Sequence, residues 1–305
     1  MRSRTVHRAV AAVAALLAVG ILSLHPHAQA PAPKSAKKRV LAWADVHAGY
    51  QHDSISHAVA TIEQLGRQSG LYDTWIRTDS QTITKHPVTF PPGTGIAGNP
   101  NGDGKPVPIT NEMFQVRDLT YFDAIFFFGV REIGLSAEQK ADLLSFVKDD
   151  GKGFVAAHSA ITSFFSWPEF GELIGGRFDE HPWGIVDATV VVDDPGFPAM
   201  QGVPSRFVVN DEHYQLKDFS RQAVRVLAHL DPASVNLTKP LVHRADADFP
   251  VAWVHQYGAG RVFYSTLGHA DTAWDNPVIR NMYFEAMKWA LKLTDGVAAA
   301  PGPRR

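Results

Sequence analysis

The segment 153–160, Gly-Phe-Val-Ala-Ala-His-Ser-Ala, decides the fold that this sequence predicts. Its first five residues are small or apolar, which is typical of a short strand buried on both faces of a sheet. His158 and Ser159 follow directly, so two polar side chains stand at the carboxyl end of the strand. Ligands of open α/β sheets bind at the carboxyl ends of the parallel strands. We therefore expect a buried central strand here, with His158 at the edge of a site.

Strand and helix patterns alternate on the amino-terminal side of this segment. Continuous apolar runs predict strands, and apolar residues at helical spacing predict helices. The predicted strands are 39–43, 72–77 and 122–128, and the predicted helices are 54–66 and 136–151. This alternation is typical of a parallel, doubly wound sheet with helices on both faces.

The carboxyl-terminal side is richer in strands. Strand-like patterns cover 186–192, 206–209, 223–229, 251–256 and 261–266, and a final helix is predicted for 277–293. Because no internal repeat is visible, the sequence indicates one α/β domain over 39–293. The tail 294–305 is rich in small residues and contains proline, so we expect it to be flexible.

Residues 82–112 interrupt this pattern with an irregular stretch rich in proline and glycine. Such a long loop inside a compact domain is usually functional or mobile. The tract 99–104, Asn-Pro-Asn-Gly-Asp-Gly, resembles the start of an EF-hand calcium loop, but the twelfth position is Thr110 instead of glutamate. The mismatch favours a turn-rich loop insertion over a calcium site.

The first thirty residues have the layout of a signal peptide. Three arginines precede an apolar run from Ala9 to Leu24, and the segment 28–30, Ala-Gln-Ala, suits cleavage by a signal peptidase. The run is shorter than the roughly 18 apolar residues that a membrane span usually needs. We expect a signal peptide over 1–30, a linker over 31–38, export to the periplasm or the extracellular space, and no stable membrane span after cleavage.

The composition excludes several classes of protein. With 45% hydrophobic and 20% charged residues, the chain of 305 residues can bury a large core. Because it contains no cysteine, disulfides, thiolate metal sites and a cysteine nucleophile are ruled out. The formal net charge of −2 and the lack of a long basic run argue against a nucleic-acid partner. The phosphate-loop, dinucleotide-binding and zinc-protease motifs are also absent.

Polar residues follow several of the predicted strands. Asp45 comes after the first strand and Arg131 after the strand 122–128. His158 follows the central strand, and His269 follows the last one. Because the carboxyl ends of parallel strands meet at one edge of a sheet, we expect these groups to converge. A lone histidine is by default a structural residue, but a strand end followed by a turn is an exposed position.

Two further groups of residues suit a sugar-sized ligand. The segment 211–214, Asp-Glu-His-Tyr, suits acid and base work, hydroxyl binding or metal ligation, and equally a solvated loop. His181 stands two residues before Trp183, and Trp274 follows His269 at a short distance. Aromatic faces beside polar groups suit carbohydrate rings, although buried tryptophans would show the same pattern.

Taken together, several of these strings resemble the ThuA-like, or trehalose utilisation, family. The strings are 153–160, Gly175-Gly176-Arg177-Phe178 with His181-Pro182, Asp211-Glu212-His213-Tyr214, and Pro250-Val251-Ala252-Trp253 leading through 258–264 to Leu267-Gly268-His269. The resemblance covers 39–293 and implies a flavodoxin-like three-layer α/β/α sandwich, similar to class I glutamine amidotransferases. Amidotransferases place a cysteine where this chain has His158, so glutamine hydrolysis through a thioester is excluded.

The resemblance implies a role in the breakdown of disaccharides such as trehalose through oxidised 3-keto sugars, with a small-molecule carbohydrate as the partner. It carries over His158, His181, Glu212, Tyr214 and His269 as pocket residues. We expect catalysis by His158, Glu212 and His269, and substrate binding by Asp45, Arg131, His181, Trp183, Tyr214 and Trp274.

Three functions stay open at this point. The first is an exported lyase or hydrolase of a disaccharide or 3-keto sugar, in which Glu212 or His158 is the base and His269 is an acid or polarises the carbonyl. A divalent metal held by some of these groups would do the same polarising work. The second is a non-catalytic protein that binds a carbohydrate or another partner. The third is a hydrolase with Ser159 as nucleophile, although the Gly-x-Ser-x-Gly pattern is lacking.

Overall fold

A computed structural model describes residues 36–47, 50–89, 108–109 and 116–299. The chain divides into the units Met1–Ala36 and Lys37–Arg305, and all described helices and strands belong to the second unit. The predicted signal peptide and most of the insertion 82–112 lie outside the described residues. Within the described ranges, no helix is both long enough and apolar enough to cross a membrane.

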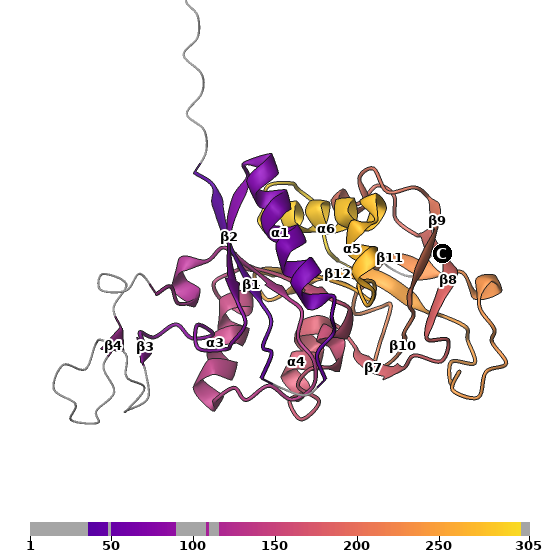
Figure 1. The fold of residues 1–305 in the computed structure, drawn as a ribbon, viewed down its shortest axis with the longest axis horizontal. Coiled ribbons are helices and arrows are strands. Elements are labelled where there is room, and N and C mark those ends of the chain that lie inside the picture. Colours follow the sequence, from indigo (N-terminus) through magenta and orange to yellow (C-terminus); the bar gives the residue numbers. More distant parts are fainter. Residues whose placement is uncertain (1–35, 48–49, 90–107, 110–115, 300–305) are drawn as a thin grey trace, which may run out of the picture. The chain divides into compact units, whose positions relative to one another are not determined.

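A nine-stranded sheet forms the centre of the domain (Figure 1). In sheet order its strands are β2 (Tyr72–Arg77), β1 (Lys38–Trp43), β5 (Ala124–Phe127), β6 (Gly153–Ala157), β13 (Gly260–Ser265), β12 (Pro250–Tyr257), β11 (Arg225–Leu230), β8 (Ile185–Val192) and β9 (Arg206–Glu212). Two further antiparallel pairs are β7 (Arg177–Glu180) with β10 (Gln215–Lys217), and β3 (Val88–Thr89) with β4 (Pro108–Ile109).

The sheet is parallel in one half and antiparallel in the other. Strands β2, β1, β5, β6 and β13 pair in parallel, whereas β12, β11, β8 and β9 continue in antiparallel pairs. The two-residue turn 258–259 can join β12 to β13 only as antiparallel neighbours, and Gly258 has the left-handed φ of 58° that such tight turns need. The predicted α/β fold with a parallel core is confirmed, and the antiparallel strands extend it.

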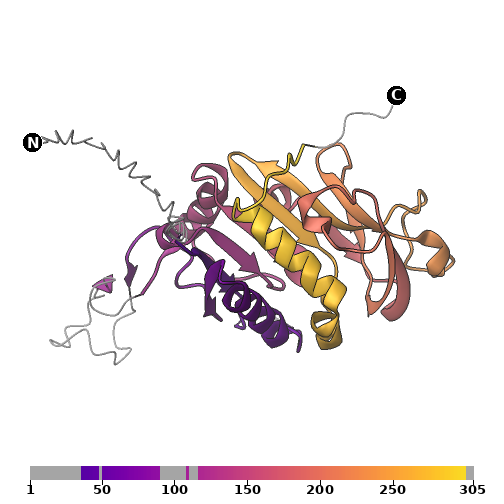
Figure 2. The ribbon, with the colours of Figure 1, turned by 90° about the horizontal axis from the view of Figure 1, so that it is seen from above.

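Helices cover both faces of the sheet (Figure 2). Helices α1 (Ile55–Ser69), α5 (Asp271–Asp275) and α6 (Pro277–Ala290) pack on one face, and α3 (Ala137–Lys148) and α4 (Pro168–Ile174) pack on the other. Alternate residues of β1 therefore enter two hydrophobic cores: Val40 and Ala42 join the first, and Leu41 and Trp43 join the second. This arrangement is the predicted three-layer sandwich.

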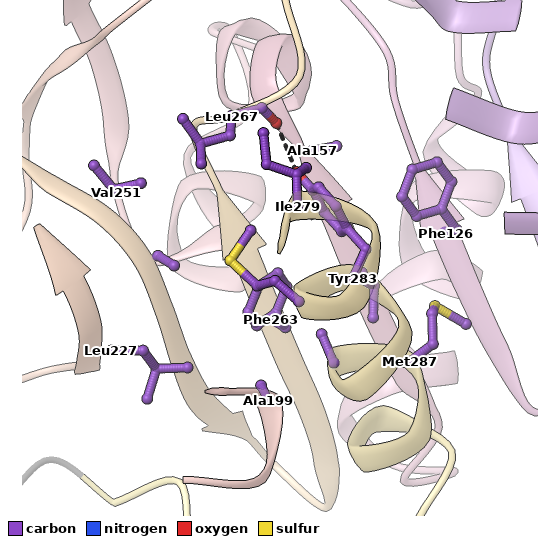
Figure 3. Close-up of a cluster of buried hydrophobic side chains, with 14 of the residues drawn as sticks. Phe126, Ala157, Ala199, Leu227, Val251, Phe263, Leu267, Ile279, Tyr283 and Met287 are labelled. Atoms are coloured by element: carbon purple, nitrogen blue, oxygen red, sulfur yellow. Dashed lines mark hydrogen bonds between the residues drawn. The ribbon is translucent and has the colours of Figure 1, made fainter. Parts of the chain in front are cut away.

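Helix α6 contributes a large share of the first core. Its Ile279, Tyr283 and Met287 recur at helical spacing and pack toward the sheet residue Phe263 (Figure 3). The hydroxyl of Tyr283 donates a hydrogen bond to the carbonyl of Leu267 at 2.7 Å. This core therefore also holds the loop after β13, in which His269 lies.

Most predicted elements lie close to their predicted bounds. Ser136 is the residue that caps the start of α3, and its side chain forms a capping box with Gln139. A serine followed three residues later by glutamine is a helix-start signal that the sequence contains. Four short elements, α4, α5, β7 and β10, were not predicted, because elements of three to seven residues show too little periodicity. Residues 294–298, expected to be part of a flexible tail, are attached to the domain. The carbonyls of Thr294 and Gly296 accept hydrogen bonds from side chains of the domain, and Ala298 is buried.

Candidate functional site

His158 stands at a sharp turn directly after β6. The chain passes from the strand into a 3-10 turn, His158–Thr162, and His158 has a left-handed φ of 43°. Non-glycine residues with such strained backbone cluster at functional sites. The Nδ1 of this fully buried side chain lies 2.7 Å from the carbonyl oxygen of Thr266. Because a carbonyl can only accept a hydrogen bond, Nδ1 holds a proton, and Nε2 is the ring nitrogen that faces the site.

Three other side chains lie near the Nε2 of His158. His52, Glu212 and His269 each offer one ligand atom, and with His158 the four atoms all lie within 4.8 Å of one another. His52 precedes α1, Glu212 ends β9, and His269 follows β13. Loops and strand ends that are far apart in the sequence thus supply one cluster, which we call the His/Glu cluster.

The spacing of three ligand atoms in the His/Glu cluster, those of His158, Glu212 and His269, fits a bound cation. The Nε2 of His158 lies 3.1 Å from the Nδ1 of His269 and 3.5 Å from the Oε2 of Glu212, and the last two atoms are 3.1 Å apart. Ligand atoms held at about 2.0–2.1 Å by one tetrahedral Zn²⁺ ion lie about 3.3–3.4 Å from each other, close to these three distances. The Nδ1 of His52 is buried and has no hydrogen-bond partner among the described residues, which calls for an ion or a water. Three imidazoles and a carboxylate suit a divalent transition metal such as Zn²⁺.

The surroundings favour the metal-binding protonation states of Glu212 and His52 and oppose that of His269. Burial alone would raise the pKa of Glu212, but contacts with the imidazoles of His158 and His269 outweigh burial and hold this pKa well below its usual range. Burial, assisted by the two neighbouring imidazoles, lowers the pKa of His52 to about 3. The contact with Glu212 raises the pKa of His269 against the opposing effect of burial. The cluster thus contains an ionised carboxylate and a neutral imidazole at His52, both of which are ready to bind a cation.

Tyr214 closes one side of the cluster. Its hydroxyl oxygen lies 2.7 Å from the Nε2 of His158, and its ring stacks on that imidazole with centroids 4.5 Å apart. Burial, followed by the nearby charge of Glu212, raises the pKa of Tyr214 well above its usual value. The phenol therefore stays protonated and acts as a hydrogen-bond donor.

Asp211 positions the loop that holds His269. Its fully buried carboxylate accepts hydrogen bonds from the backbone N–H of Gly268 at 2.6 Å and of Ala270 at 3.0 Å. Gly268 has a φ of 128°, and a Cβ at this position would lie 2.8 Å from the ring of Trp274. Glycine is therefore required here, and the two hydrogen bonds fix the backbone on both sides of His269.

The cluster borders a cavity of about 760 Å³. This volume is typical of small-molecule sites. The cavity is lined by Tyr50, His52, Val130, Arg131, Glu132, Thr162, Phe165, Phe178, His181, Glu212, Tyr214 and His269. Polar side chains and aromatic rings thus line the same cavity as the cluster.

The structure brings together six of the nine predicted site residues: His158, Glu212 and His269 in the cluster, and Arg131, His181 and Tyr214 in the lining of the cavity. The other three lie outside that lining. Asp45 accepts a hydrogen bond from the hydroxyl of Ser80. Trp183 is buried and donates to a backbone carbonyl, and Trp274 lies in the first core, stacked on Tyr283. These two tryptophans are structural residues in this fold.

Sequence reasoning missed His52, Tyr50 and Phe165. His52 lies between β1 and α1, at the carboxyl end of the first strand, where the analysis singled out Asp45. The same positional argument therefore applied to His52, but nothing in the local pattern distinguished it from His47. In the structure His47 is largely exposed and pairs with Asp45, whereas His52 points its ring toward those of His158 and His269 at 5.0 and 4.8 Å.

Ser159 does not have the surroundings of a nucleophile. It is fully buried, and its hydroxyl donates a hydrogen bond to the backbone carbonyl of Gly129 at 3.0 Å. A serine nucleophile needs a base within hydrogen-bond reach and access to the substrate. The hypothesis of a Ser159 hydrolase therefore gains no support from the geometry.

The sequence matches the ThuA family, described as trehalose utilisation, over residues 39–290. Among solved structures, a putative ThuA-like protein from Bacteroides uniformis ATCC 8492 is similar, with a TM-score of 0.63 and 21% identity over 85% of this chain and 94% of that one. A second, from Parabacteroides merdae ATCC 43184, has a TM-score of 0.57 and 16% identity over 86% and 93% of the two chains. At these identities the structures show a common fold. Among curated proteins no sequence match is found.

Proposed function

The chain belongs to the ThuA family of trehalose utilisation, and on that premise we propose that it is a metal-dependent enzyme that cleaves the glycosidic bond of a 3-keto sugar. The observation that supports this proposal most is the His/Glu cluster beside the cavity of about 760 Å³. A divalent cation bound there would polarise the keto oxygen of the sugar and stabilise negative charge on it. Ordinary glycosides lack this carbonyl, so the cluster suits the oxidised sugar better than the parent one.

The reaction that this chemistry allows is an elimination. In a 3-keto glycoside the proton on carbon 2 is acidic because it lies beside the carbonyl. A base removes this proton, the electron pair forms a double bond between carbons 1 and 2, and the bond from carbon 1 to the glycosidic oxygen breaks. The leaving oxygen takes up one proton, so atoms and charge balance without an oxidant or reductant.

His181 is the side chain best placed to move that proton. It lines the cavity, and its Nδ1 lies 3.2 Å from a carboxylate oxygen of Glu180. A carboxylate at Nδ1 orients a neutral imidazole and leaves Nε2 as the base. The protonated Nε2 can then return the proton to the leaving oxygen. We assign the base to His181 instead of Glu212 or His158, because the last two face each other inside the cluster.

The experiment that tests the proposal measures turnover of a 3-keto disaccharide by the metal-loaded protein and its His181→Gln variant. We expect kcat of the variant to fall by about 10²–10⁴, because general acid–base catalysis contributes that much. Metal content should stay unchanged, since His181 lies outside the cluster. His243→Gln is the matched control: His243 is half exposed like His181 and also has its Nδ1 near a carboxylate, that of Asp179, at 2.9 Å.

Two outcomes would contradict this function. Equal turnover by His181→Gln and His243→Gln would show that His181 takes no part in the reaction. A metal-loaded wild-type protein that binds sugars but converts no 3-keto sugar would overturn the enzyme proposal and favour a carbohydrate-binding protein on the same scaffold.

We also propose that the chain is exported. The arginines before the apolar run Ala9 to Leu24, and the small residues before position 31, support this. Mass spectrometry of the protein from its native host should find an amino terminus at Pro31. A terminus at Met1 in a cytoplasmic fraction would contradict export.

A further inference from the structure

The hydroxyl of Tyr214 and a bound cation would compete for one nitrogen atom. The hydroxyl oxygen lies 2.7 Å from the Nε2 of His158, and His158 is one of the four residues of the His/Glu cluster. The Nδ1 of the same ring already contacts the carbonyl of Thr266, so it offers no alternative to either partner. An imidazole nitrogen that binds a metal has neither a lone pair nor a proton left for a hydrogen bond. Metal loading therefore ends the hydrogen bond between Tyr214 and His158.

The ring of Tyr214 is held by contacts that do not involve its hydroxyl. It is buried, it stacks on the imidazole of His158 with centroids 4.5 Å apart, and it meets the ring of Phe178 edge to face at 4.8 Å. The ring therefore stays in place when the hydrogen bond to His158 is lost. Because a buried O–H group without an acceptor is costly, the hydroxyl has to turn to another oxygen nearby.

Two acceptors are open to this hydroxyl. One is the carboxylate of Glu212, which is a hydrogen-bond neighbour of Tyr214. The other is an oxygen of a ligand, because Tyr214 lines the cavity of about 760 Å³. A carboxylate that binds a cation shares its charge with that cation, whereas a keto oxygen gains charge during the reaction. Hydrogen bonds to a charged oxygen are roughly twice as strong as neutral ones, so the reacting ligand is the better acceptor.

Tyr214 also lies near the proposed base. The rings of Tyr214 and His181 have centroids 6.4 Å apart, and both residues line the cavity. In a 3-keto sugar, the carbon that loses its proton is bonded directly to the keto carbon. A side chain whose ring neighbours the base and whose hydroxyl reaches the cluster is therefore suited to contact the keto oxygen while the base acts on the adjacent carbon.

We propose that Tyr214 is a catalytic residue whose hydroxyl, released from His158 by metal loading, donates a hydrogen bond to the keto oxygen of the sugar. This inference rests on the proposed function, which places that oxygen beside the His/Glu cluster. When the base removes the proton from carbon 2, the electron pair moves toward the keto oxygen, and it returns as the glycosidic bond breaks. The hydroxyl stabilises the negative charge on this oxygen and keeps its own proton, so the balance of the elimination is unchanged.

The test uses Tyr214→Phe, which removes the hydroxyl and keeps the ring. We expect kcat for a 3-keto disaccharide to fall by about 10²–10³, which is the usual cost of losing one donor to an oxyanion. KM should change little, because the charge on the oxygen develops only in the transition state. The affinity for Zn²⁺, measured by calorimetry, should not fall and should rise by up to about 10-fold, because the competitor for the Nε2 of His158 is gone.

A second measurement does not depend on turnover. Kojic acid is a flat pyranone whose ring carbonyl stands beside an enol, so it resembles the enolised keto sugar and cannot undergo the elimination. We expect Tyr214→Phe to weaken the binding of kojic acid to the metal-loaded protein by about 10-fold or more, because the lost hydrogen bond is to a charged oxygen. Methyl α-glucoside has no carbonyl and should bind equally to the two proteins.

Tyr72→Phe is the matched control. Tyr72 is fully buried, and its hydroxyl donates a hydrogen bond to the carbonyl of Ile62 at 3.0 Å, outside the lining of the cavity. The substitution removes a buried phenol hydroxyl as Tyr214→Phe does. It should leave turnover, Zn²⁺ affinity and kojic acid affinity at the wild-type values.

Two results would overturn the role of Tyr214. A loss of Zn²⁺ affinity by about 10–100-fold in Tyr214→Phe would make Tyr214 a positioning residue for the metal ligands. Unchanged kcat and unchanged kojic acid affinity would show that the hydroxyl does not reach the ligand, while turnover by the wild type would keep the proposed reaction. Conversely, a wild type that converts no 3-keto sugar, together with weaker kojic acid binding in Tyr214→Phe, would remove the reaction and keep the hydroxyl as a donor to the ligand.

Discussion

Replacing His158 with alanine is expected to weaken the binding of Zn²⁺ by more than about 100-fold. The Nε2 of His158 faces both His269 and Glu212 at 3.1 and 3.5 Å, so the substitution removes one of the four ligand atoms. Loss of residues that merely orient ligands costs about 10–100-fold in affinity, and loss of a ligand costs more. Calorimetric titration of the chelator-stripped protein measures the effect.

A second variant distinguishes the loss of a metal ligand from a loss of folding caused by substituting the buried His158. His269→Ala removes another ligand from a side chain that is 20% exposed, so the cavity that it leaves is open to solvent. We expect a loss of affinity similar to that of His158→Ala, with an unchanged circular dichroism spectrum. His243→Ala, at an exposed histidine that pairs with Asp179, should bind the cation like the wild type. Wild-type affinity in both cluster variants would show that the cluster does not hold the metal.

Replacing Asp211 with asparagine is expected to lower the free energy of unfolding by about 2–4 kcal/mol. The carboxylate is fully buried and accepts from two backbone N–H groups, and hydrogen bonds to a charged group contribute about 1.5–3 kcal/mol each. In the amide, one of the two oxygens becomes an NH₂ group, which leaves a buried N–H of the His269 loop without an acceptor. Urea unfolding of the metal-free protein measures the difference.

Asp187→Asn is the control for this change. Asp187 is exposed on β8, where it accepts from the side chain of Asn210, so its substitution should stay within about 0.5 kcal/mol. Asp211→Asn should also weaken metal binding, because it loosens the backbone on both sides of His269. A variant as stable as the wild type, with the same metal affinity, would show that Asp211 does not position this loop.

The order of elements could be predicted from the sequence because the local signals are strong. The apolar run 153–157 ends in polar residues, and the capping box at Ser136 marks the start of α3. The antiparallel half of the sheet could not be derived in the same way. Its strand order, with β11 between β12 and β8, depends on long-range packing that no local pattern records.

The candidate site could be predicted only in part. His158 and His269 follow parallel strands of the core, so topology alone places them at one edge. Glu212 ends β9, which lies at the edge of the antiparallel half, and only the family resemblance linked it to the histidines. Aromatic residues were expected at the site as well, but periodicity cannot separate a buried tryptophan such as Trp274 from an exposed ring such as Phe165.

The most direct test of the account is an anomalous diffraction measurement on crystals of the metal-loaded protein. The account predicts one strong anomalous peak per chain, within about 2.0–2.2 Å of ligand atoms from His52, His158, Glu212 and His269. A map in which this position shows no anomalous peak, while the metal lies at another site or binds nowhere, would contradict the central claim that these four side chains form a metal centre.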